Sequence, residues 1–221
     1  MIHIFLVPLN PVRFEMGHII KAAGCISRLV VREFRPNGRP RYHFATAFFV
    51  SETLLLTAGH NYADFDNTCT QWWITEPGIS QIDVDDVGNE KIPLHRCTLV
   101  ESLYPRGGKY WRDIAIFRCE SYKSCQYVPL ESATPPGNAI MDIIGCPAEV
   151  SDEWIGTHPR LQNTRKGRTD VEKALPKGSL LFTRGILEAS FPRMSTMEYR
   201  LSTCPGMSGS CVLYDGHVVG N

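Results

Sequence analysis

The stretch Cys204-Pro-Gly-Met-Ser-Gly-Ser-Cys211 has the composition of a loop that could present a nucleophile. Ser208 lies between Gly206 and Gly209, and glycine lets the backbone adopt positive φ or pass close to another group. Such a loop can direct successive backbone N–H groups into one small space, as an oxyanion hole requires during acyl transfer. A serine hydroxyl is a weak nucleophile at neutral pH, so it needs a histidine to accept its proton and a carboxylate to orient that histidine.

Two histidines are candidates for the general base. His60 follows a β-type run on the small-residue turn Thr57-Ala-Gly-His60, where it could face a cleft. His217 belongs to a turn and strand close after Ser208, and we expect it to face solvent. A lone histidine is more often structural than catalytic, because its apolar body and polar tip are easily satisfied in a fold.

Asp113 is the candidate for the orienting carboxylate. It precedes the apolar run Ile114-Ala-Ile-Phe117, where an acid is costly to bury unless it meets a hydrogen-bond donor such as imidazole Nδ1–H. Alone, it is more often an ordinary aspartate at the start of a strand. A histidine, an aspartate and a glycine-flanked serine nevertheless follow one another, each beside an expected strand, and this order favours a triad of His60, Asp113 and Ser208.

Short runs rich in aromatic and β-branched residues, separated by turn signals, predict an all-β protein of the barrel or sandwich class. Two of these turn signals are Asn37-Gly38 and Asp215-Gly216. A short helix is expected over 169–175. We expect strands at 19–31, 42–50, 53–58, 71–75, 92–100, 114–119, 139–146, 180–190, 198–203, 211–214 and 217–219.

The break at 120–137, which ends Ser-Ala-Thr-Pro-Pro-Gly, predicts a linker between two halves of the chain. The expected organisation is an irregular N-terminal arm over 1–20, a first β unit over 21–119 and a second over 138–221. The second unit contains a charged insert, 151–178, which forms either a solvated loop or a loop at the rim of a cleft.

Composition argues against several classes of protein. The 221 residues contain 23 Lys+Arg and 23 Asp+Glu, and this balance does not favour a nucleic acid or a membrane surface as partner. No apolar run reaches the length of a membrane span. The N-terminus is a poor signal peptide and the chain has no Asn-x-Ser/Thr sequon, so an intracellular location is favoured over secretion. The 8 cysteines form no CxxC pair, which argues against a zinc site and favours buried free thiols over disulfides.

Three motifs resemble the signature blocks of the trypsin/chymotrypsin-like serine proteases: Thr57-Ala-Gly-His60, Asp113-Ile-Ala-Ile116 and Gly206-Met-Ser-Gly209. The resemblance is closer to the V8-like glutamyl endopeptidase branch. That branch also lacks a cysteine after the histidine, has Gly-x-Ser-Gly-Ser at the nucleophile, and has a Gly-Tyr-Pro segment similar to Gly145-Cys-Pro147 here.

This resemblance implies two antiparallel β-barrels of the trypsin-like type with the active site between them. Ser208 would be the nucleophile, His60 the general base and then acid, and Asp113 the orienting carboxylate. The backbone N–H groups of Gly206 and Ser208 would form the oxyanion hole. The implied reaction is hydrolysis of a protein or peptide substrate through an acyl-enzyme, by a monomer that needs no cofactor or metal.

Some positions depart from the pattern of the family. Ser202 lies where trypsin has the acid at the floor of its specificity pocket, so cleavage after Lys or Arg is not expected. Thr203 matches a threonine with which V8-like enzymes hold a glutamate side chain, and we expect both residues to bind substrate. The family continues past the position of Asn221 with a further strand, so the second barrel is expected to lack its last strand.

Two other functions fit the same motifs. One is a weakly active or inactive pseudoprotease that acts as a protein-binding module, and the other is an esterase or other acyl hydrolase with the same triad. An α/β-hydrolase does not fit. Its nucleophile motif is Gly-x-Ser-x-Gly, whereas residue 210 is serine here, and its histidine comes last in the chain.

Overall fold

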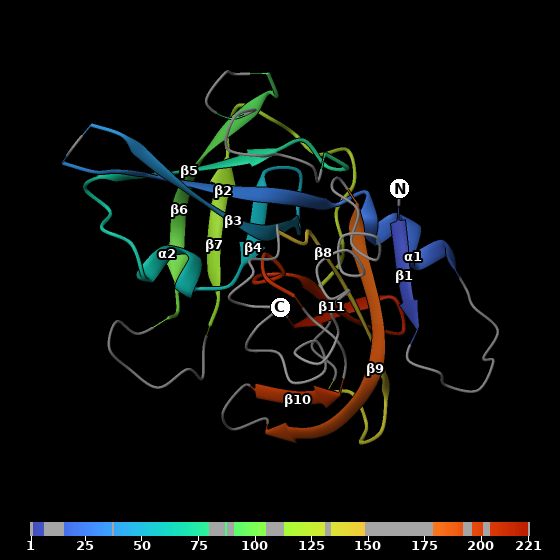
Figure 1. The fold of residues 1–221 in the computed structure, drawn as a ribbon. Coiled ribbons are helices and arrows are strands. Elements are labelled where there is room, and N and C mark those ends of the chain that lie inside the picture. The colour runs from blue at the N-terminus through green and yellow to red at the C-terminus, as the bar shows by residue number, and fades with distance from the viewer. Residues whose placement is uncertain are drawn as a thin grey trace, which may run out of the picture.

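The computed structural model describes residues 2–6, 16–36, 38–79, 87, 91–104, 113–130, 134–148, 179–191, 196–200 and 204–220. Within these residues the chain forms strands β1 to β12 and helices α1 and α2, so the prediction of an all-β protein is confirmed (Figure 1). The predicted helix over 169–175 and the charged insert lie outside the described residues.

The first sheet is a closed antiparallel barrel in the order β2-β3-β4-β7-β6-β5. Closure pairs every strand on both sides and so leaves no exposed strand edge. The first predicted β unit is therefore a six-stranded barrel. Its strands are β2 (Ile26–Phe34), β3 (Pro40–Phe49), β4 (Leu54–Thr57), β5 (Thr70–Thr75), β6 (Leu94–Ser102) and β7 (Ala115–Cys119).

Every second side chain of the strands points into this barrel and fills it. Leu29 and Val31 of β2 and Ile74 of β5 belong to one buried cluster, together with Phe48 and Phe117 from the facing strands. Alternate residues of a strand point to opposite faces, so one set of side chains enters the core. Burying each of these large apolar side chains contributes about 1.5–3 kcal/mol relative to leaving it exposed.

The second sheet has the order β1-β9-β8-β11-β12, with β10 paired to β9. Only the first sheet closes among the described residues, so the expectation of two barrels is not confirmed. Figure 1 shows β9 curving past the other strands, with β1 beside it. The strands of this sheet are β1 (Ile2–Leu6), β8 (Ile140–Gly145), β9 (Leu180–Phe191), β10 (Thr196–Arg200), β11 (Cys211–Tyr214) and β12 (His217–Gly220).

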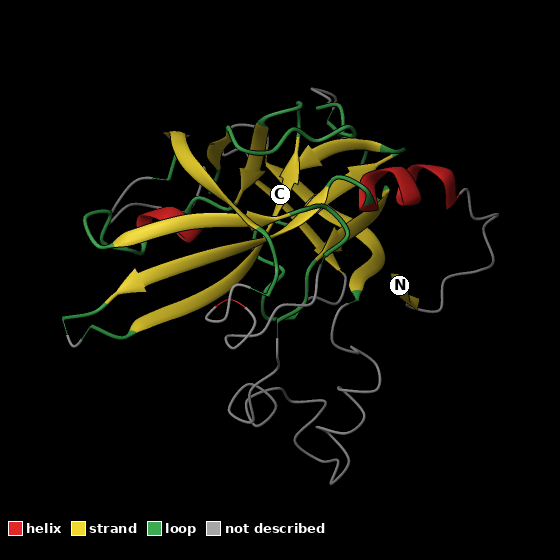
Figure 2. Ribbon diagram, turned by 90° about the horizontal axis from the view of Figure 1, so that it is seen from above, coloured by secondary structure: helices red, strands yellow, loops and turns green. Residues whose placement is uncertain are grey.

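The N-terminal region differs from its prediction. The first twenty residues include β1 and part of α1 (Met16–Ala23) instead of an irregular arm, and the strand expected from residue 19 begins at Ile26. Ile19, Ala22 and Ala23 are buried at helical spacing. A short apolar run does not distinguish a helix from a buried strand, which explains the error. The helices α1 and α2 (His60–Ala63) lie on opposite sides of the molecule (Figures 1 and 2).

Two predicted turns have the expected backbone. Asp215 and Gly216 have φ of 49° and 78°, and Tyr214 pairs with His217 across them. Positive φ at both central residues is the requirement of a type I′ hairpin turn. Gly38 has φ of 76° in the connection from β2 to β3.

The first part of the connection between the two sheets, residues 120–130, lies along the first barrel. Ser124 N donates to Glu52 O at 2.8 Å and Val128 N to Phe49 O at 3.0 Å, after which Val218 N of β12 donates to Pro129 O at 3.2 Å. The limits of the domains stay a prediction. Neither helix in the described part of the chain has the length and apolar character needed to cross a membrane.

Candidate active site

His60 and Asp113 come from neighbouring strand ends of the first barrel. His60 begins α2 soon after β4, and Asp113 lies two residues before β7. Because β4 pairs antiparallel with β7, with Thr57 opposite Ala115, these two places adjoin. His60 Nδ1 lies 2.8 Å from Asp113 Oδ2, and the backbone N–H of His60 donates to Asp113 Oδ1 at 2.8 Å. One carboxylate therefore fixes both the ring and the backbone of the histidine.

The pKa values of the pair follow from this contact. The hydrogen bond to Asp113 raises the pKa of His60 above its ordinary value, although burial of the ring acts in the opposite direction. Burial raises the pKa of Asp113, but hydrogen bonds from the side chain and backbone of His60 outweigh it and hold that pKa below its usual value. With the carboxylate ionised, Nδ1 carries the proton and the neutral ring keeps its lone pair on Nε2, as a general base requires.

The loop that carries Ser208 depends on its two glycines. Gly206 and Gly209 both have φ of +84°, in the left-handed region that side chains with a Cβ rarely adopt. Two successive turns shape the loop, since Met207 N donates to Cys204 O at 3.2 Å and Ser210 N to Met207 O at 2.9 Å. Within the described residues, the N–H groups of Gly206 and Ser208 donate to no protein acceptor. These are the two donors predicted for the oxyanion hole.

Thr46 of β3 ties this loop to the first barrel. Its backbone N–H donates to Ser208 O at 2.9 Å. Its hydroxyl donates to Gly206 O at 2.8 Å and accepts from Cys146 N at 2.9 Å. One side chain therefore joins three segments at the site. None of the sequence motifs includes Thr46, and the signal that could have indicated it is a polar residue in the buried half of a strand.

Asn61, next to His60, makes a second connection to the loop. Its Nδ2 donates to Thr57 Oγ1 at 2.9 Å and to Ser208 O at 3.3 Å, while Thr57 Oγ1 donates to Thr46 O at 2.7 Å. In the sequence, Asn61 served only to show that no cysteine follows the histidine, a feature shared with the V8-like branch. The structure gives it a role in holding the histidine turn against the serine loop.

His60, Asp113 and Ser208 line one cavity of about 230 Å³. The first two residues lie beside strands of the first barrel, whereas Ser208 lies three residues before β11 of the second sheet. No hydrogen bond among the described residues joins Ser208 Oγ to His60. Hydrogen bonds between catalytic groups are often long in structures without substrate. Tyr199, Cys204 and Met207 also line the cavity, which adds apolar surface beside the polar groups.

Of the other candidate residues, the structure describes only His217. Ser202 and Thr203, expected to bind substrate, lie outside the described residues. His217 is exposed on β12 and does not line the cavity, in agreement with its expected position facing solvent. All eight cysteines are free thiols in the structure, and most of them are buried.

No protein-family model matches this sequence, and no curated protein shows significant similarity to it. The likeness to trypsin-like proteases therefore rests on the three motifs and on the fold. A closed antiparallel barrel of six strands is compatible with that fold.

Proposed function

We propose that this protein is a serine endopeptidase of the V8-like type, which hydrolyses peptide bonds through an acyl-enzyme formed on Ser208. The observation that carries the proposal is the 2.8 Å contact between His60 Nδ1 and Asp113 Oδ2, on a cavity that Ser208 also lines. Three residues chosen by motif and order, and distant in the chain, share one cavity, and this supports the triad more strongly than any single motif does.

The chemistry assigns one task to each residue. Ser208 Oγ attacks the carbonyl carbon of the peptide while His60 Nε2 accepts the hydroxyl proton, and Asp113 stabilises the imidazolium that forms. The N–H groups of Gly206 and Ser208 stabilise the negative charge on the carbonyl oxygen. His60 then donates its proton to the leaving amine, the C–N bond breaks, and water, deprotonated by His60, releases the acyl group from Ser208.

The proposal also assigns a role to each sheet. The first barrel supplies the base and its orienting carboxylate, whereas the second sheet supplies the nucleophile and is the counterpart of the second barrel of the family. Ser202 and Thr203 keep their proposed role beside the substrate side chain.

The decisive experiment is labelling with a fluorophosphonate probe, which reacts with an activated serine. The parent protein should be labelled on Ser208, and Ser208→Ala should remove the label. His60→Ala should slow labelling by about 10⁴-fold, because the loss of a triad member has an effect of that size. Ser121→Ala, at an exposed serine outside the cavity, is the matched control and should label normally.

The same preparation separates the proposal from its two alternatives. Turnover of esters without turnover of peptides would indicate an acyl hydrolase that is not a protease. A folded parent protein that takes no label, and whose partner binding is unaffected by Ser208→Ala, would indicate an inactive binding module and overturn the proposal.

A further inference from the structure

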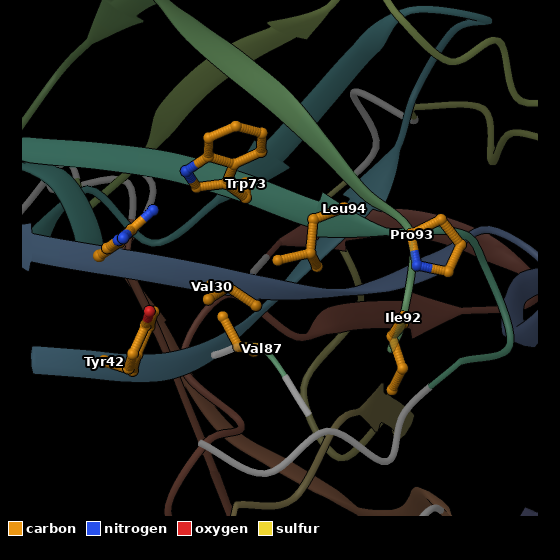
Figure 3. A pocket seen from close by; sticks show the side chains of 8 residues that line it. Val30, Tyr42, Trp73, Val87, Ile92, Pro93 and Leu94 are labelled. Atoms are coloured by element: carbon orange, nitrogen blue, oxygen red, sulfur yellow. The ribbon is translucent and has the colours of Figure 1, made fainter. Parts of the chain in front are cut away.

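A second cavity, of about 340 Å³, lies on the first barrel and is larger than the candidate active site. It is formed by strands β2, β3 and β5 and by the segment that leads into β6, and it shares no lining residue with the site of Ser208 (Figure 3). Its lining residues are Val30, Arg32, Tyr42, Trp73, Val87, Ile92, Pro93 and Leu94.

The cavity lies on the outer face of the barrel. Leu29 and Val31 point into the barrel core, so Val30 and Arg32 point to the opposite face of β2. Ile74 of β5 also belongs to the barrel core, so its neighbour Trp73 points to the outer face. Val30 is nevertheless 0% exposed, so this part of the outer face is covered.

Two of the lining residues carry hydrogen-bond donors without acceptors. Arg32 Nε and Trp73 Nε1 are both buried and have no hydrogen-bond partner in the part of the chain that the structure describes. Leaving a buried donor unpaired costs free energy, and native proteins contain few such groups. Figure 3 shows the Trp73 indole nitrogen on the same side of the cavity as Tyr42, whereas Leu94, Pro93 and Ile92 extend along the other side.

Arg32 also lacks a carboxylate partner among the described residues. Its guanidinium lies 4.7 Å from the centre of the Phe34 ring and 5.9 Å from that of the Tyr42 ring. The adjacent carboxylate, Glu33, is on the other face of the strand, and its ion pairs are with Arg35 and His43, each at 3.8 Å. Among its described lining residues, the cavity therefore contains a cation near aromatic rings, with a second donor and no carboxylate.

We propose that this cavity binds a carboxylate carried by an apolar group. Arg32 and Trp73 donate to the carboxylate, because a guanidinium and a further N–H match its oxygens. Ile92 and Leu94, which are partly exposed, contact the apolar part. The volume falls within the range of about 300–1,000 Å³ that small-molecule sites have. The carboxylate can belong to a free apolar acid or to the C-terminal residue of a peptide, and the inference does not depend on the proposed function.

Calorimetric titration of the full chain tests the site. The Ser208→Ala protein is used so that no probe is turned over at the other cavity. Octanoate is compared with octanol, and a short peptide ending in leucine with its C-terminal amide. We expect at least one acid to bind at least tenfold more tightly than its neutral analogue, because a charge-assisted hydrogen bond is lost in the neutral compound. Which acid binds identifies the source of the carboxylate.

Two substitutions then place the acid in this cavity. Arg32→Gln should weaken acid binding about tenfold or more. Trp73→Phe, which removes the N–H donor with the five-membered ring of the indole and keeps a benzene ring, should weaken it about fivefold. Arg118→Gln, at an exposed arginine of β7 outside the cavity, is the matched control and should leave affinity unchanged.

Three results would overturn the inference: no binding of any probe by folded protein, equal affinity for acid and neutral analogue, or unchanged affinity in folded Arg32→Gln. Thermal melting establishes that each variant is folded. Should Arg32→Gln not fold, the comparison of acid with neutral analogue and the Trp73→Phe variant still decide the question.

Discussion

At the scale of single residues, Asp113 orients His60 through two contacts. One carboxylate oxygen meets the ring nitrogen and the other accepts the backbone N–H, each at 2.8 Å. The ring therefore cannot turn about its side chain without breaking the first contact, while the second keeps the start of α2 in place. Losing Asp113 would change the tautomer, the position and the pKa of the histidine together.

The pH dependence of turnover tests this arrangement. The pKa of His60 is raised above 6.5, the ordinary pKa of histidine. The neutral ring, which acts as the base, therefore becomes the main form only at a higher pH than for an ordinary histidine. Activity should therefore be lost as pH falls through a midpoint above that value. In Asp113→Asn the largest cause of the raised pKa is gone, so the midpoint should move to lower pH and kcat should fall by about 10⁴-fold.

The measurement is kcat/KM against pH from about pH 5 to pH 9. His217→Ala is the control, since this histidine is exposed and does not line the cavity, and the pH profile of the variant should match that of the parent protein. A parent midpoint at or below that of free histidine would contradict the assignment of His60 as the base.

At the scale of elements, β3 holds the nucleophile loop through Thr46. Thr46→Val keeps the shape of the side chain but removes its hydroxyl, so Cys146 N and Gly206 O both lose a partner. We expect the free energy of unfolding to fall by about 1–3 kcal/mol. Displacement of the loop should lower kcat by about 10- to 100-fold with little change in KM.

Thr46→Ser keeps a hydroxyl at the same position and should restore most of kcat. Thr98→Val, at an exposed threonine of β6, provides the matched control for stability. If Thr46→Val lowers the melting temperature but leaves kcat unchanged, Thr46 supports the fold without positioning the loop.

Gly209 offers a second test of the same loop. A Cβ at this position would lie 2.3 Å from both Thr46 O and Thr57 Oγ1, whereas a Cβ at Gly78 would meet nothing within 4 Å. The φ values of the two residues are nearly equal, +84° and +85°. Gly78→Ala should therefore lower the free energy of unfolding only by the backbone strain, about 1–2 kcal/mol. Gly209→Ala should lower the free energy of unfolding by clearly more than this, as measured by urea denaturation. Equal losses would show that the loop can move away from β3.

At the scale of the whole molecule, Arg28 joins the first barrel to the second sheet. It belongs to β2, is 4% exposed, and donates through one terminal nitrogen to Cys146 O at 2.7 Å and through the other to Pro147 O. Ala148 N then donates to Pro205 O at 2.7 Å, at the start of the nucleophile loop. A buried cation from one sheet thereby fixes backbone of the other.

Arg28→Met should disrupt this connection. Loss of two charge-assisted hydrogen bonds should lower the free energy of unfolding by about 3 kcal/mol, which for a chain of this size corresponds to a fall of about 6–12 °C in melting temperature. Arg118→Met, at an exposed position of β7, should change the melting temperature little. Differential scanning calorimetry checks both, and equal melting temperatures would contradict the role of Arg28.

The features that could be predicted from the sequence are those that depend on a local pattern of residues. Alternation and turn residues located most strands, and Asp215-Gly216 located a hairpin, because those signals act over a few residues. The motifs selected His60, Asp113 and Ser208. The roles of Thr46, Asn61 and Arg28 were not predictable, because each depends on segments that only the folded chain brings together. The parallel pairing of β1 with β9 was missed for the same reason.

That pairing has a consequence for the order of events during synthesis. Ile2 lies opposite Leu180, whereas the barrel needs only residues up to Cys119, the last of β7. A ribosome adds about 5–20 residues per second. After the last barrel strand has been synthesised, about 3–12 s therefore pass before β9, the partner of β1, has been made. Strand β1 is therefore synthesised before the barrel but paired after it, and during this interval it is open to chaperones.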